Sequence, residues 1–205
     1  MSRTQRAATL PVRFFARPAE VVAAELVGTV MISRIGGAVT AGRIVETEAY
    51  LGVIDPASHG FAGRRTVHNA SIFGAPGLWY VYRSYGMHWC ANLVAAAAGE
   101  AAAVLVRALE PVEGLEVMRE RRGAVPDRQL CSGPGKLCRA LGITRDLDGV
   151  TMQGSDVLVV RGARPARVAA TRRIGITRAE EWPLRFVEAG SRWLSRPWRE
   201  PDAAP

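Results

Sequence analysis

The sequence predicts a single α+β domain in which helices flank a curved, mainly antiparallel β-sheet. The chain has 205 residues, 48% of them hydrophobic, which is enough for one packed core and too few for two ordinary enzyme domains. Hairpin turns link most of its β-rich centre, whereas a parallel sheet would show strands alternating with helices. We find no internal repeat. The domain is therefore placed at residues 13–196, between a flexible basic arm at 1–12 and a flexible tail at 197–205.

The first predicted elements are a helix and a hairpin. The helix runs from Pro18 to Leu26, because Pro18 suits a first turn, apolar residues recur along one face, and Gly28 ends the pattern. Two β-rich runs follow, TVMISRI and TAGRIVETEAY, and Gly36 and Gly37 join them as a hairpin.

A second strand pair is predicted in LWYVYRSYGMHWCANLVA, with its turn near residues 84–86. AVLVRALEP then predicts a buried strand, which leads into a helix from Pro111 to about Arg122. Leu115 and Met118 should face inward from that helix. Further on, CSGPGKLCRALGI predicts a short helix that ends at Gly142, and SDVLVVRG and PLRFVEAG predict late strands.

The chain is strongly basic, with 27 Lys and Arg residues against 19 acids and a formal net charge of +8. Arginines are concentrated in two segments without acids, one before Glu20 and one from Val157 to Arg178. Such segments suit contacts to the phosphates of a polyanion, although a bias in composition or a solvated surface would produce the same pattern. The candidate contacts to such phosphates are Arg161, Arg164, Arg172, Arg173 and the single lysine, Lys136.

Several classes of protein are disfavoured. No apolar run reaches the roughly 18 to 20 residues of a membrane span, and the N-terminal residues lack a secretory signal, so we expect a cytoplasmic protein. The glycine motifs of nucleotide-binding loops are absent. Cys90, Cys131 and Cys138 are too widely spaced for a disulfide framework or a zinc knuckle. We expect free thiols and no metal. The alternative is a metal site in which Cys131 and Cys138 join His59 or His88.

Two acids share one face of the strand RIVETEAY. Alternation places Glu46, Glu48 and Tyr50 on one side, and their neighbours on the other. If that face lines a pocket, a carboxylate beside apolar and aromatic groups would have a raised pKa and would accept a proton from water. The alternatives are a hairpin with one solvent face, or the acid pair of a carbohydrate glycosidase.

Aromatic residues are dense between positions 79 and 89, where the sequence has Trp79, Tyr80, Tyr82, Tyr85, His88 and Trp89. Such a set is able to cover one face of a sheet as part of the core. Tyr85 differs because it precedes Gly86 in the predicted turn, where a large side chain projects from the surface. An exposed aromatic beside basic segments suits base stacking or wedging into a duplex.

Two further polar side chains, those of His59 and Arg107, need hydrogen-bonding partners. His59 is a lone histidine in a predicted loop, and such a residue is more often a local hydrogen-bonding group than a catalyst. Arg107 stands among apolar residues in the predicted buried strand, so it must find a carboxylate or another acceptor. Glu48 is a candidate partner.

Several blocks occur in a fixed order along the chain: RIVETEAYLG, His59 eleven positions beyond Glu48, GLWYVYRSYGM with CANL, VLVRALEPVEGLEVMR, LCSGPGKLCRAL, and RIGI with EWPLRF. In order and spacing they resemble the alkyladenine (3-methyladenine) DNA glycosylases, or methylpurine glycosylases, over residues 10–194. The resemblance implies a mixed fold similar to the formyltransferase C-terminal domain and a monofunctional enzyme of base-excision repair. Such an enzyme flips damaged purines, alkylated or deaminated, out of double-stranded DNA. An activated water then hydrolyses the N-glycosidic bond and leaves an abasic site. No cofactor is implied, and we expect a monomer.

The resemblance also assigns roles to single residues. Glu48 matches the general base that deprotonates the water attacking the sugar C1′, and Arg107 matches the arginine that helps to hold this water. Tyr50 and His59 match groups that stack on, or hydrogen-bond to, the flipped base. Tyr82 would form part of the opposite wall of the base pocket.

Three more positions concern the pocket and the duplex. Tyr85 matches the residue that fills the gap left by the flipped nucleotide. Asn92 matches a polar pocket residue that screens purines by their exocyclic groups. His88 stands where other members of the family carry an aromatic residue. The residues between 62 and 72 and between 97 and 102 are not assigned a function.

Two other functions remain as alternatives. One is a catalytically silent nucleic-acid-binding module with the same basic surface and wedge, which the joint presence of Glu48 and Arg107 disfavours. The other is a carbohydrate glycosidase that uses Glu46 and Glu48, and its Arg-rich segments would then have no purpose. A strand-cleaving glycosylase needs an amine nucleophile, and Lys136 in a Gly/Pro-rich segment is a poor candidate.

Overall fold

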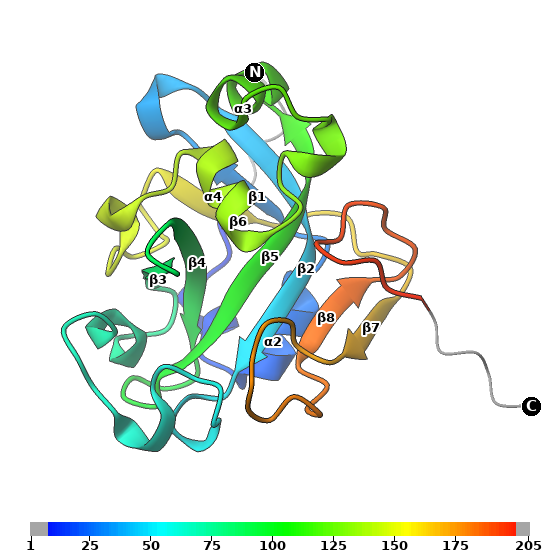
Figure 1. The fold of residues 1–205 in the computed structure, drawn as a ribbon. Helices are drawn as coiled ribbons and strands as arrows, with labels where there is room; N and C mark the ends of the chain where they lie inside the picture. Colours follow the sequence, from blue (N-terminus) through cyan, green and yellow to red (C-terminus); the bar gives the residue numbers. More distant parts are fainter. Residues whose placement is uncertain (1–7, 200–205) are drawn as a thin grey trace, which may run out of the picture.

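An eight-stranded sheet organises the computed structural model, which describes residues 8–199 (Figure 1). The strands are β1 (Val30–Ser33), β2 (Thr40–Tyr50), β3 (Trp79–Ser84), β4 (His88–Ala95), β5 (Ala102–Glu113), β6 (Val157–Val160), β7 (Val168–Thr171) and β8 (Arg185–Glu188). Six of them follow the order β3-β4-β5-β2-β1-β6, while β8 pairs with β2 and with β7. These pairings are antiparallel, which confirms the predicted fold class.

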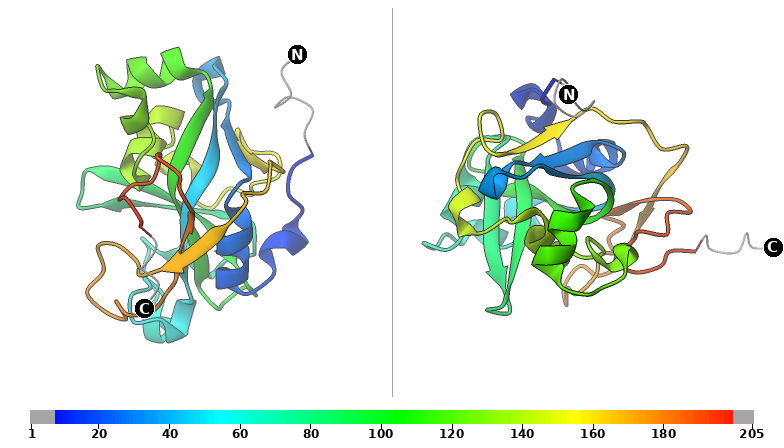
Figure 2. Two further views of the ribbon diagram at one scale, coloured as in Figure 1. Left: turned by 90° about the vertical axis from the view of Figure 1, so that its right-hand side faces the viewer. Right: turned by 90° about the horizontal axis from the view of Figure 1, so that it is seen from above.

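Helices cover both faces of the sheet. They are α1 (Val12–Phe15), α2 (Ala19–Leu26), α3 (Leu115–Arg122) and α4 (Pro134–Leu141). Short 3₁₀ turns occupy Ile35–Gly37, Gly52–Ile54, Phe61–Gly63, Ala70–Phe73, Asp127–Gln129 and Arg145–Leu147. Seen along the sheet, α1 and α2 lie on one side, and α3 and α4 lie on the other (Figure 2). The helices thus bury the apolar residues of the central strands on both faces.

Strand β2 is the centre of this arrangement and carries the paired acids. It pairs with β5 along one edge, and with β1 and then β8 along the other. The Thr47 hydroxyl donates to the carbonyl of Ala23 in α2 at 2.9 Å. Because side chains alternate along a strand, Glu46, Glu48 and Tyr50 lie on the face away from α2. The register with β5 shifts on both sides of Glu46, so this part of the ladder is irregular.

Most predicted elements are confirmed. Helix α2 follows Pro18, which caps it rather than forming its first turn. The two hairpins are β1–β2 and β3–β4, and the first turns through Gly36 and Gly37, both with positive φ. The short helix α4 ends at Gly142 in the left-handed conformation.

The predicted helix start at Pro111 is wrong. Strand β5 continues through Pro111 to Glu113, and the register shift near Gly42 lets a residue without an N–H remain in the strand. Helix α3 starts after Gly114, whose φ is +74°. A Cβ at Gly114 would lie 2.2 Å from the carbonyl oxygen of Val39, so the close approach requires glycine. Met118 is buried as predicted, while Leu115 is half-buried.

Two short elements and two boundaries were not predicted. Helix α1 and strand β7, four residues each, carry no strong periodic signal. Leu10 is buried and Thr9 pairs with Val160, so part of the predicted flexible arm belongs to the folded domain. At the other end Trp198 packs against a core cluster, within the predicted tail. The remaining residues of the arm and the tail, 1–7 and 200–205, lie outside the described part of the chain.

Candidate active site

Glu48 has no exposed surface, and three donors hold its carboxylate. The Tyr50 hydroxyl donates to Oε2 at 2.9 Å, and Arg107 Nη1 donates to the same oxygen at 3.2 Å. The backbone N–H of Ile174, in the segment that follows β7, donates to Oε1 at 2.7 Å. Tyr50, Arg107 and Ile174 also line a cavity on this face of the sheet. The carboxylate therefore lies directly behind the cavity wall.

Burial raises the pKa of Glu48 above its usual value. Desolvation of the carboxylate outweighs the opposite effects of the Arg107 charge, the Ile174 N–H and the Tyr50 hydroxyl. A carboxylate with a raised pKa binds a proton more tightly and is a better general base. Only the ionised form accepts a proton, so this capacity is lost as the pH falls through the raised pKa.

Arg107 lies between the two acids of β2. Its Nε donates to Glu46 at 3.1 Å and its Nη1 donates to Glu48, while the residue is only 8% exposed. It occurs where the β2–β5 register shifts, between residues that face Thr47 and Glu46. The predicted partner Glu48 is thus confirmed, and Glu46 is a second partner.

Glu46 serves the fold rather than the cavity. Its two oxygens accept from Arg107, from Arg185 Nε at 2.7 Å, and from the Ser195 hydroxyl and N–H at 2.7 and 2.6 Å. It is fully buried and does not line the cavity. An acid held by donors in this way is a poor partner for Glu48 in glycoside hydrolysis, where both carboxyl groups must reach the sugar.

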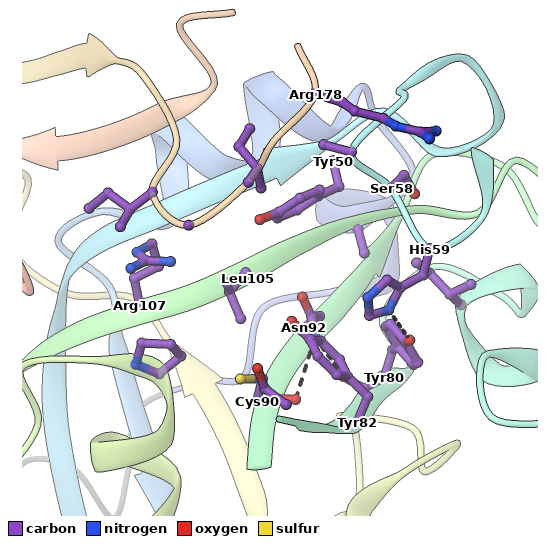
Figure 3. A pocket seen from close by; sticks show the side chains of 18 of the residues that line it. Tyr50, Ser58, His59, Tyr80, Tyr82, Cys90, Asn92, Leu105, Arg107 and Arg178 are labelled. Carbon is purple, nitrogen blue, oxygen red and sulfur yellow. Dashed lines mark hydrogen bonds between the residues drawn. The ribbon is translucent and has the colours of Figure 1, made fainter. Parts of the chain in front are cut away.

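A cavity of about 720 Å³ opens on this face of the sheet. The predicted pocket residues Tyr50, His59, Tyr82 and Asn92 all line it, together with Arg107. They converge from β2, β3, β4, β5 and the loop that carries His59 (Figure 3). A mixed aromatic and polar lining of this size suits a planar, hydrogen-bonding ligand.

His59 is part of a small aromatic cluster. Its Nδ1 lies 2.6 Å from the Tyr80 hydroxyl, and its ring meets that of Tyr82 edge-on with centroids 4.5 Å apart. Burial lowers the pKa of His59, so the neutral imidazole is favoured near pH 7. The bond to Tyr80 fixes the ring in the cavity wall. The sequence alone assigns no role to Tyr80, because its part in the site is the hydrogen bond to His59, which lies 21 positions away.

Asn92 is also held by the backbone of β3. Its amide nitrogen donates to the carbonyl of Tyr80 at 3.0 Å. This use of the nitrogen leaves the amide oxygen as the group that Asn92 presents to a ligand. The predicted polar pocket position is therefore built into the wall.

Tyr85 stands at the tip of the β3–β4 hairpin and is 85% exposed. Tyr85 and Gly86 have φ of +49° and +67°, and the Met87 N–H donates to the Ser84 carbonyl, so the turn is of the type that suits a hairpin. A left-handed conformation is strained for tyrosine. The predicted projecting side chain is confirmed, and a core role for Tyr85 is wrong.

The predicted phosphate contact of Arg173 is wrong. Arg173 is 5% exposed and forms a bidentate ion pair with Asp55, which is itself fully buried. Its guanidinium carbon lies 4.7 Å from the centroid of the Tyr50 ring. A run of arginines in sequence does not reveal that one of them points into the domain.

The other predicted phosphate contacts are spread over the surface. Arg161 and Arg164 are exposed and act electrostatically on Glu25 of α2, on the face away from Glu48. Arg172 is exposed beside Arg173. Lys136, in the first turn of α4, donates to the Ser132 hydroxyl at 3.3 Å.

A second cavity, of about 780 Å³, adjoins the first and shares His59 and Tyr82 with it. Its lining includes four arginines: Arg64, Arg83, Arg145 and Arg178. We call these two connected cavities the groove. Arg178 belongs to the basic segment from Val157 to Arg178, whereas Arg64, Arg83 and Arg145 lie on other segments, so no single run of charge in the sequence predicts this group.

Within residues 8–199, no three His, Cys, Asp or Glu side chains are grouped so as to hold a metal ion. The three cysteines are free and buried. Among the same residues, no helix has the length and apolar character that a membrane span requires.

The chain matches known proteins over nearly its whole length. Residues 13–192 match the model of the methylpurine-DNA glycosylase family. A relative from Nitrosospira multiformis is 48% identical over 88% of this chain and 91% of its own length. Relatives from Rhodopseudomonas palustris strain HaA2 and from Methanoculleus marisnigri are each 47% identical, over 91% and 92% of this chain and 90% and 99% of their own lengths. All three carry the name "Putative 3-methyladenine DNA glycosylase".

Proposed function

The chain belongs to the methylpurine-DNA glycosylase family, and from this premise we propose that it is a monofunctional enzyme that excises damaged purines from double-stranded DNA. The damaged purines are alkylated or deaminated. The chain acts as a monomer, by a single attack of water on the flipped nucleotide, and leaves an abasic site in an intact strand.

The environment of Glu48 is the observation that carries this proposal. A buried carboxylate whose pKa is raised by desolvation is costly for folding, and such groups concentrate at catalytic sites. A module that only binds DNA has no use for it. The position of Glu48 behind the wall of a base-sized cavity explains the cost.

The chemistry follows from this placement. Glu48 takes a proton from water, and the water oxygen forms a bond to C1′ while the bond between C1′ and the base nitrogen breaks. The departing base keeps the bonding electrons. A purine alkylated at N3 or N7 is cationic before cleavage, so it leaves as a neutral base without further protonation. A deaminated purine is neutral before cleavage, so its departing anion must take up a proton from an acid or from solvent. Arg107 keeps Glu48 in place and donates toward the same region, which suits a role in holding the water.

The cavity walls match the needs of a flipped purine. Tyr50, Tyr82 and His59 offer ring faces and edges to the base. Asn92 offers an amide oxygen at a fixed position and thereby discriminates among exocyclic groups. Because burial favours neutral His59, the imidazole does not add a positive charge beside a cationic base.

The surroundings of the cavity match duplex DNA. The four arginines of the groove place positive charge beside the pocket, where phosphates next to the flipped nucleotide would lie. Tyr85 projects from the hairpin that also supplies Tyr82, so the wedge and the pocket wall belong to one hairpin.

Release of a purine from a defined duplex tests the proposed function. The substrate carries one methylated or deaminated purine, the buffer contains a chelator, and undamaged duplex is the control. We expect free base and a strand that breaks only after alkali. Borohydride present during turnover should trap no covalent adduct. Absence of base release would refute the glycosylase, and an adduct lost in Lys136→Ala would refute attack by water.

Replacement of the wedge should separate binding from folding. Tyr85→Ala is expected to weaken binding to lesion-containing duplex by about 1 to 3 kcal/mol, or roughly 5- to 150-fold in Kd, because a stacked aromatic is lost. Thermal unfolding should be nearly unchanged, since Tyr85 is 85% exposed. Val21→Ala is the matched control, because Val21 is an exposed apolar residue of α2, which lies on the face of the sheet away from Glu48. A Kd equal to that of the parent would remove Tyr85 from the DNA interface.

A further inference from the structure

Asp55 and Arg173 form a buried ion pair behind the wall of the base cavity. Arg173 Nη2 donates to Asp55 Oδ1 at 2.9 Å and Nη1 donates to Oδ2, and neither side chain has exposed surface. Arg173 Nε is buried without a hydrogen-bond partner. Burial of two charges and one unsatisfied N–H costs free energy that a hydrophobic pair would avoid. Stability alone therefore does not account for this pair.

The pair holds the end of β2 on both sides of Tyr50. Arg173 Nη1 also donates to the carbonyl of Ala49 at 3.1 Å, and the Leu51 N–H donates to Asp55 Oδ2 at 3.1 Å. Between these two bonds, the Arg173 guanidinium lies against the Tyr50 ring. The ion pair thus contacts the Tyr50 ring and the backbone on both sides of it, and the Tyr50 hydroxyl in turn donates to Glu48.

The same pair connects two loops to Glu48. Arg173 directly precedes Ile174, whose N–H donates to Glu48, and residues 174–178 line the cavity. The Ala57 N–H donates to Asp55 Oδ1, two positions before His59. Figure 1 shows these two loops, in cyan and orange, at the same end of the sheet.

We propose that Asp55 and Arg173 are positioning residues, which together hold the Tyr50 hydroxyl and the Ile174 N–H on the Glu48 carboxylate. This inference deepens the proposed function and rests on it for its effect on excision. Neither residue touches the substrate. Their effect passes through two of the three donors that keep Glu48 ionised and oriented.

The proposal predicts a specific change in the pH profile. The groups that face Glu48 are Tyr50 and Glu46 on β2, Arg107 on β5, Cys90 on β4, Arg185 opposite on β8, and the Ile174 N–H. Weakening the bonds from Tyr50 and Ile174 removes stabilisation of the ionised form, while Arg107 stays in place. The pKa of Glu48 then rises further, and the acid limb of excision moves to higher pH.

The test compares the parent with Arg173→Met and Arg173→Lys. Single-turnover excision of a methylated purine is measured against pH, with thermal unfolding and with binding to a duplex that holds an uncleavable abasic analogue. We expect the acid limb to move up by about one pH unit in Arg173→Met, which is about a tenfold loss on that limb. Arg173→Lys keeps a cation beside Asp55 and should shift less. Arg43→Met is the control, because Arg43 is paired with Glu110 and Glu188 away from the cavity.

A second readout does not depend on activity. Titration of the Glu48 carboxyl by ¹³C NMR, assigned by its absence in Glu48→Gln, should give a higher pKa in Arg173→Met than in the parent. If Arg173→Met does not fold, Arg173→Lys decides by the same two measurements. A folded variant with the parental pH profile and the parental Glu48 titration overturns the proposal. A parent that releases no base refutes the proposed function instead, while the NMR comparison still tests the pair.

Discussion

Glu48→Gln is expected to bind lesion-containing duplex but to excise roughly 10² to 10⁴-fold more slowly than the parent in single-turnover assays. The amide keeps the size and the place of the carboxylate on β2, so the cavity keeps its shape. It cannot take a proton from water. The loss therefore falls on the chemical step, and the Kd for an uncleavable duplex should change little.

Two matched variants show whether the loss is specific to Glu48. Glu188→Gln changes a half-buried glutamate of β8 that pairs with Arg43, and it should leave excision unchanged. Glu46→Gln should lower stability more than the chemical step, because Glu46 anchors Arg185 and Ser195. A Glu48→Gln variant within a factor of about three of the parent would remove Glu48 as the general base. So would an excision defect confined to Glu46→Gln.

The local part of the site follows from short-range sequence patterns. Alternation along β2 correctly places Glu46, Glu48 and Tyr50 on one face, where Arg107 donates to both acids and Tyr50 donates to Glu48. The hairpin turn correctly predicts the projection of Tyr85. Buried Arg107 correctly requires a carboxylate. Each of these inferences uses residues that are neighbours in sequence, or one simple rule on the burial of charge.

The long-range part of the site does not follow from such patterns. The Ile174 N–H reaches Glu48 across 126 positions, and Ser195 reaches Glu46 across 149. The periodicity of β2 does not indicate which of the two acids on one strand face accepts a hydrogen bond from Ile174 and which accepts from Ser195. The resemblance to a known family, rather than the strand pattern, assigned the base to Glu48.

Arg173 shows the limit of charge patterns. It lies in a segment rich in arginine and poor in acids, and its nearest sequence neighbour Arg172 is exposed. Its partner Asp55 is 118 positions away in a loop. One of the five predicted phosphate contacts is therefore buried in the domain.

The second large effect is expected on stability. Arg107→Met should lower the free energy of unfolding by about 3 to 5 kcal/mol, because it removes one partner from a buried ion pair. Glu46 keeps Arg185 and Ser195, but Glu48 keeps only the Tyr50 hydroxyl and the Ile174 N–H. The lost charge attraction also raises the pKa of Glu48 further. Excision near pH 7 should fall more than tenfold and recover in part at higher pH, where Glu48 ionises.

A double-mutant cycle tests this explanation of Arg107. If the cost of Arg107→Met comes from an unpaired carboxylate, then adding Glu48→Gln removes that charge. The double variant should be more stable to denaturant than Arg107→Met alone, although both variants excise a base at least tenfold more slowly than the parent at neutral pH. Arg107→Lys keeps a cation but cannot reach both acids in the same way, so it should be intermediate. A double variant no more stable than Arg107→Met would show that Arg107 acts through packing, and the ion pair would then not explain how Glu48 is held in the ionised state.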